Sequence, residues 1–107
     1  MVLGTDDAVQ LLVWGAVDNN KDTWTTQART TATGIAYAEL GITTDPASPS
    51  TQLTEAVNLL AAGLCQGAPQ PQQQAFFTNE GMKLLKAARG DKDLDAEWGE
   101  THPIFAD

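Results

Sequence analysis

The residue types that most often carry chemistry are scarce in this chain. His102 is the only histidine and Cys65 the only cysteine. A Ser-His-Asp arrangement would need His102, which falls in an expected tail, a poor place for a preorganised base. A structural zinc site would need several carboxylates beside these two residues, which is unusual for zinc. The sequence therefore predicts no catalytic residue, no metal site, no cofactor and no enzymatic activity.

Two further patterns resemble binding sites, one for calcium and one for an anionic partner, but both are better interpreted as solvated charges. The run from Asp91 to Asp95 alternates acidic residues like a calcium loop, but Ala96 stands where such a loop needs glycine, and His102 where it needs an acid. We interpret it as a solvated charge run. Lys83, Lys86 and Arg89 form the one basic cluster and are interpreted as a solvated helix end.

Composition narrows the possible partners. The 107 residues include 14 acids but only six Lys and Arg, for a net charge of −8. This balance argues against binding nucleic acid through phosphate contacts and against anionic membranes. It suits a basic protein partner, or solubility in high salt. No apolar run reaches the roughly 20 residues of a membrane span, and the first four residues do not resemble a signal peptide, so an intracellular product is expected.

The most apolar stretch, Ser50–Gly67, predicts the helix around which the chain is organised. Ser48 is the expected N-cap and Pro49 the first helical residue, while Gly67 ends the helix. Cys65 is expected to be a small core residue, with no disulfide partner in the chain. The predicted apolar face contains Leu53, Ala56, Val57, Leu60 and Leu64, widened by Leu59, Ala62 and Gly63.

Two helices are predicted before this one. The first, Asp6–Val17, has Thr5 as its N-cap. The second, Asp22–Leu40, has Asp22 or Asn20 as its cap and Gly41 as its stop, and a strand is the competing prediction for its threonine-rich part. Its stripe of Trp24, Ala28, Ala32 (or Thr31), Ile35 and Ala38 is rich in small residues, which permit close helix packing within or between subunits. The candidate subunit-packing residues are Ala28, Ala32, Ile35 and Ala38.

The chain after the organising helix is predicted as a linker, a helix and an arm. Residues 66–74 read as an extended Pro/Gln linker. The next helix should begin within Gln72–Thr78 and reach Arg89, with Gly90 as its stop. It should turn Met82, Leu85 and Ala88 inward above Phe76 or Phe77. The fold class is therefore all-α, a bundle of three to four helices over residues 1–90 with an extended acidic arm over residues 91–107.

The arm combines many acidic residues with apolar anchors. Such a tail can become ordered on a partner, with a few anchors buried at the interface. The alternative is an arm folded back onto its own core. The candidate partner-binding residues are Leu94, Trp98, Ile104 and Phe105.

Three segments in order carry a resemblance to a known family: VQLLVWGAV, then WTTQARTTATGIAYAELGI, then LTEAVNLLAAGLCQG. A short helix, a long helix ending in Leu-Gly, and a second long helix that packs on the first resemble the head–tail connector (adaptor) proteins of tailed viruses. The resemblance covers roughly Thr5 to Arg89.

The resemblance implies a structural virion protein at the head–tail junction, made in the host cytoplasm. Members form a homo-oligomeric ring, typically twelve-fold, between the portal protein and a downstream neck or tail protein. The C-terminal arm typically inserts into the portal or a neighbouring subunit. DNA passes through the ring without specific binding, and an acidic wall that repels phosphates is compatible with this.

Two alternatives stay open. The chain could be a small helical regulatory module, for instance antitoxin-like, whose acidic tail binds a basic protein. It could also be another virion protein, such as a stopper or tail terminator, although those folds are generally richer in strands.

Overall fold

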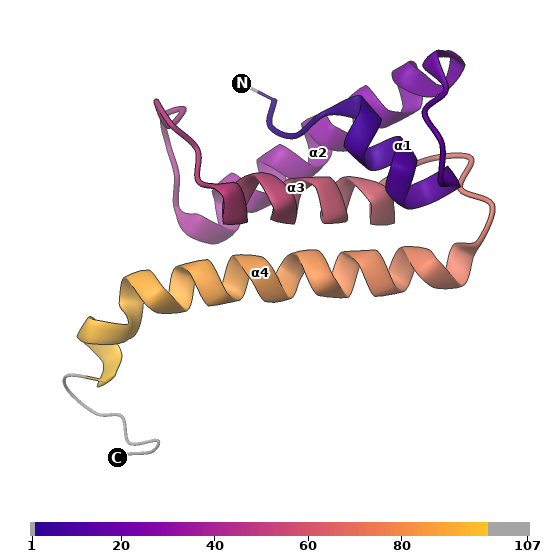
Figure 1. The fold of residues 1–107 in the computed structure, drawn as a ribbon. Helices are drawn as coiled ribbons and strands as arrows, with labels where there is room; N and C mark the ends of the chain where they lie inside the picture. The colour runs from indigo at the N-terminus through magenta and orange to yellow at the C-terminus, as the bar shows by residue number, and fades with distance from the viewer. Residues whose placement is uncertain (1, 99–107) are drawn as a thin grey trace.

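The computed structural model describes residues 2–98, with side chains for residues 2–70 and 72–88 (Figure 1). Every regular element in this range is helical, which confirms the all-α prediction and makes the alternative of a strand within residues 22–40 wrong. The elements are α1 (Asp6–Trp14), a single 3-10 turn η1 (Asn19–Lys21), α2 (Asp22–Leu40), α3 (Thr51–Leu64) and α4 (Pro71–Trp98).

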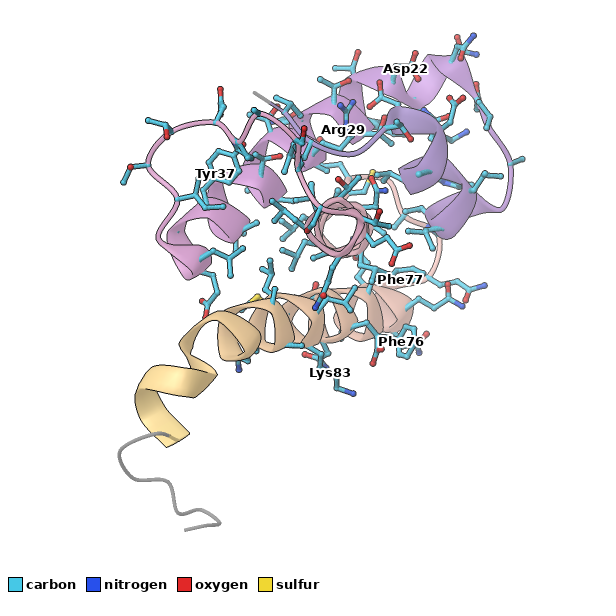
Figure 2. The ribbon with its side chains drawn as sticks, turned by 60° about the vertical axis from the view of Figure 1, so that its left-hand side comes forward. Asp22, Arg29, Tyr37, Phe76, Phe77 and Lys83 are labelled. Carbon is cyan, nitrogen blue, oxygen red and sulfur yellow. The ribbon has the colours of Figure 1, made fainter. Side chains whose placement is uncertain are left out.

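Helix α3 lies at the centre of the bundle. It runs between α1 and α2 on one side and α4 on the other (Figures 1 and 2), and all three helices contact it. Burial of its apolar side chains on both sides is the main source of stability available to a bundle of this size. The prediction that this stretch organises the chain is confirmed. The buried residues of α3 are Leu53, Ala56, Val57, Leu60, Ala61 and Ala62.

The two ends of α3 differ from the sequence prediction. Ser50, not Ser48, is the N-cap, and its hydroxyl accepts a hydrogen bond from the Leu53 amide at 3.1 Å. Because Ser50 caps the helix, α3 begins at Thr51 and Pro49 lies outside it. The helix ends at Leu64, before the predicted Gly67, and Leu64 at this last position is 38% exposed rather than buried.

The first two helices follow the predicted signals with one shortening. Thr5 caps α1 as expected, since its hydroxyl accepts from the Ala8 amide at 3.1 Å. Gly15 takes a left-handed conformation with φ of 77° and ends α1 at Trp14, three residues before the predicted end. Helix α2 has the predicted bounds, although its N-cap is Lys21 rather than Asp22 or Asn20, and the Lys21 side chain makes no capping hydrogen bond.

Helix α4 begins earlier and ends later than predicted. Pro71 occupies its first position, where a missing N–H costs nothing, so the expected extended linker stops at Gln70. Gln74 then donates to the Cys65 carbonyl at 2.8 Å, which ties the first turn of α4 to the end of α3. The helix continues past Gly90 to Trp98, because one glycine costs a helix only about 1 kcal/mol relative to alanine.

Helices α3 and α4 approach each other closely at two glycines. A methyl group on Gly81 would lie 2.8 Å from Leu60 Cγ, and one on Gly63 would lie 2.8 Å from the Gln74 carbonyl oxygen. Both positions therefore need the absence of a side chain. Of the predicted inward residues of α4, Leu85 is fully buried, and Met82, Ala88 and Phe77 are half-buried. Phe76 is exposed.

Candidate functional site

The predicted subunit-packing residues of α2 do not form one accessible surface. Ala28 and Ala32 are buried in the core of the same chain, Ile35 is half-buried, and Ala38 is exposed. Small residues here let α2 approach its neighbours within the subunit. Contact between subunits through this stripe remains a prediction for Ala38 and the exposed part of Ile35.

The predicted partner-binding residues of the arm fall where the structure gives no side-chain description. Leu94 and Trp98 belong to the last turns of α4, of which only the backbone is described. Ile104 and Phe105 lie outside the described residues, as does His102. Their role in partner binding stays a prediction.

A buried polar network joins α1 to the start of α2. The Gln10 side chain is fully buried, accepts from the Asp18 amide at 2.7 Å and donates to Asp22 Oδ1 at 2.8 Å. Its amide nitrogen also lies 3.4 Å from the hydroxyl of Thr25, another buried side chain. Each polar group has a partner, so this network fixes the turn between the helices. Apolar periodicity does not predict this network, because a polar residue on an inward face interrupts the apolar pattern.

An ion pair fastens the N-terminal segment to α2. Arg29 donates to Asp6 Oδ1 at 2.7 Å and to the Leu3 carbonyl at 3.1 Å, and the Thr26 hydroxyl donates to the same carboxylate. Burial raises the pKa of Asp6, but the hydrogen bonds from Arg29 and Thr26 outweigh it and leave the pKa below its usual value. The contact is structural, since every group in it is engaged within the chain.

Aromatic residues stack beside this region. The rings of Trp14 and Trp24 lie 6.3 Å apart at an interplanar angle of 27°, and Lys21 Nζ lies 5.1 Å from the centre of the Trp14 ring. The contact joins the last residue of α1 to the first turn of α2.

An open apolar groove of about 480 Å³ runs between α1 and α3. Leu11 is 54% exposed at its edge, and Leu12 and Leu59 are half-buried in its walls. Glu55 lies at its rim and forms no ion pair with another described side chain. The groove can hold an apolar side chain and attract a cation beside it. Its lining residues are Ala8, Leu11, Leu12, Glu55, Asn58 and Leu59.

A second surface lies on the side of α4 that faces away from α3. Phe76 is 57% exposed there, and Figure 2 shows Phe76 and Lys83 directed away from the bundle while Phe77 is directed toward it. Lys83 pairs with Glu80 at 3.1 Å on this surface, and Lys86 has no ionic partner among the described side chains. We call this the α4 outer face, formed by Phe76, Asn79, Glu80, Met82, Lys83 and Lys86.

The Cys65 thiol, the remaining reactive group, is not accessible to solvent. Cys65 is buried, as predicted, and burial raises the pKa of its thiol. Across the described part of the chain, no cluster of three or more side chains suited to a metal ion occurs. Within the same range, no helix combines the length and apolarity needed to cross a bilayer.

Comparison of the chain with models of known families, with curated proteins and with solved structures finds no match. The features that bear on its function are therefore its helices, the two surfaces and its charge.

Proposed function

We propose that this chain is a structural virion protein, the adaptor of a head–tail connector in a tailed virus. In this role, copies form a ring between the portal and the neck or tail, and DNA passes through the ring without specific binding. The adaptor would be located at the head–tail junction of the virion and would have no enzymatic activity.

One observation carries the proposal: the order and packing of the first three helices. Short α1 precedes long α2, which ends at Leu40 and is followed by Gly41, and α2 packs against the apolar helix α3. This is the arrangement that the resemblance implies for residues 5–89. Helix α4 extends to residue 98, and its last turns reach beyond the bundle (Figure 1). This position suits contact with a further subunit.

The charge distribution supports the same role. Residues 2–70 contain seven acidic side chains and two basic ones, a balance of −5. A ring of many such copies would multiply this charge around its channel. Negative walls repel DNA phosphates, so DNA would slide through without adhering.

The test is cryo-electron microscopy and cross-linking mass spectrometry of particles from the host that makes this protein. We expect a ring of this chain joined to a portal protein, with cross-links from residues 91–107 to the portal or to the adjacent copy. A chain found free of particles, or located in the capsid shell or tail tube, would contradict the proposal.

The second candidate is a regulatory module that binds a basic protein. The net charge of −8 and the acidic residues after position 90 favour it. The same cross-linking experiment separates the two candidates, because this module would cross-link to one basic cellular protein in cells that contain no virus particles.

A further inference from the structure

The α1–α3 groove and the α4 outer face have complementary chemistry. The groove offers apolar walls with the carboxylate of Glu55 at its rim, and the α4 outer face offers the exposed ring of Phe76 with Lys83 and Lys86 on the following turns. An aromatic side chain flanked by cations fits an apolar groove flanked by an acid.

The charged side chains that line the two surfaces also differ in sign balance. Glu55 is the charged residue that lines the groove, whereas the α4 outer face has two lysines, Lys83 and Lys86, and one acid, Glu80. Lys86 and Glu55 both lack an ionic partner among the described side chains. Two copies facing each other through these surfaces would pair charges that each copy leaves unpaired.

These surfaces cannot meet within one molecule. Helix α3 separates α1 from α4, and the α4 outer face points away from α3 (Figure 2). A contact between these two surfaces would therefore join two molecules.

We propose that the α4 outer face of one copy docks into the α1–α3 groove of a second copy, with Phe76 against Leu11 and Lys86 beside Glu55. This deepens the proposed ring and rests on it, because it assigns the surfaces through which neighbouring copies contact each other. The contact joins two different surfaces, so every copy keeps one surface free for the next, and the chain of contacts closes into a ring or continues as a filament.

The proposed contact between copies is small, so its affinity should be low. One aromatic anchor and one or two ion pairs belong to the weak class of interfaces, which bury less than about 1,200 Å². We therefore expect the free chain to associate only at high concentration, with a Kd of about 0.1–1 mM. A partner that arrays several copies would raise their local concentration and promote ring closure.

The experiment uses two variants of the full chain, each with one damaged surface. Leu11→Asp places a charge in the groove, and Phe76→Asp places the same charge on the α4 outer face. Both positions are exposed, so the fold is retained, which circular dichroism checks. Val17→Asp is the matched control, because Val17 is equally apolar and exposed but belongs to neither surface.

Sedimentation velocity at up to about 1 mM gives the outcome. We expect the wild-type chain and Val17→Asp to associate and each damaged variant alone to stay monomeric. Mixed in equal amounts, the two variants should form a dimer and nothing larger, because only one intact groove and one intact α4 outer face then meet.

Charge reversal gives an independent measurement. Glu55→Lys alone and Lys86→Glu alone should each weaken association by about tenfold or more, since each brings like charges together. The double variant should recover association, because the pair is restored with its signs exchanged.

A wild-type chain that stays monomeric at about 1 mM, or a mixture of the two Asp variants that stays monomeric, would overturn this docking. That result leaves the adaptor proposal standing if the chain is still found in a ring at the portal. Self-association through these surfaces by a chain that is absent from virus particles would support the docking and overturn the adaptor role.

Discussion

Gln10 is the residue whose removal should damage the fold most for its size. Gln10→Ala leaves the Asp18 amide without its acceptor, removes the donor to Asp22 and opens a cavity at a fully buried position. We expect a loss of about 2–4 kcal/mol in the free energy of unfolding, measured by urea denaturation. Gln27→Ala, at an exposed site on α2, is the control and should change stability by less than about 0.5 kcal/mol. Equal losses in the two variants would contradict a structural role for the buried network.

Asp6 should make stability depend on pH. Its pKa is lower in the folded chain than in the unfolded chain, because the hydrogen bonds from Arg29 and Thr26 outweigh the effect of burial. Its contribution is therefore fully present above the unfolded pKa, which is near 3.8, and is lost as pH falls through the folded pKa. Urea midpoints of the wild-type chain and Asp6→Asn should differ clearly at pH 7 and converge near pH 2.

The neighbouring carboxylate supplies the control for this measurement. Asp7 lies in the same first turn of α1 but is exposed and forms no ion pair with a described side chain. Asp7→Asn should shift the urea midpoint much less than Asp6→Asn at pH 7. A gap between wild type and Asp6→Asn that stays constant down to pH 2 would contradict the assignment.

At the scale of elements, the contact between α3 and α4 depends on glycine. Gly81→Ala brings a methyl group within 2.8 Å of Leu60 Cγ and 3.0 Å of the Ala56 carbonyl. We expect a net loss of about 1–2 kcal/mol despite the higher helix propensity of alanine. The measurement is the thermal midpoint.

A second glycine makes the comparison clean. Gly34 lies within α2, and a methyl group there would meet nothing within 4 Å. Gly34→Ala should therefore stabilise the chain by up to about 1 kcal/mol through helix propensity alone. If both substitutions raise the thermal midpoint, the helices are not in the close contact described.

Elements were predictable from sequence where a local signal and the apolar pattern agreed. The bounds of α2 are the predicted ones because a turn precedes Asp22 and a left-handed Gly41 follows Leu40. Where two signals competed, the prediction failed. The Pro/Gln composition of residues 66–74 predicts a linker that includes Pro71, although proline also suits the first position of a helix, which it occupies in α4. Which of two competing signals prevails depends on how the helices pack, and residue spacing along the chain does not reveal that packing.

The candidate surfaces were less predictable than the elements. The stripe of small residues on α2 indicated close packing, but the same stripe serves equally well inside a subunit and between subunits. Ala28 and Ala32 are buried in the core of the subunit. The α1–α3 groove combines residues more than 40 positions apart in sequence, such as Leu11 and Glu55, so it exists only once the two helices are placed.

At the scale of the whole molecule, the charge of −8 should make stability depend on salt. Repulsion among the acidic residues destabilises the compact state and is screened as ionic strength rises. We expect the thermal midpoint to increase between about 0.05 M and about 1 M KCl, where the Debye length falls to about 3 Å. The doubly neutralised variant Asp7→Asn/Glu55→Gln should show a smaller increase. A midpoint that falls with KCl would show that attractive pairs outweigh this repulsion.

The central position of α3 also governs how the molecule opens. Detachment of α1 exposes one side of α3 and detachment of α4 exposes the other, and neither event requires the other because α3 stands between them. The amide hydrogens of α3 can exchange with solvent freely only after its neighbours have left, so they should be the last to take up deuterium. The bundle should therefore lose its outer helices in separate, reversible steps, while α3 reports the global free energy of unfolding.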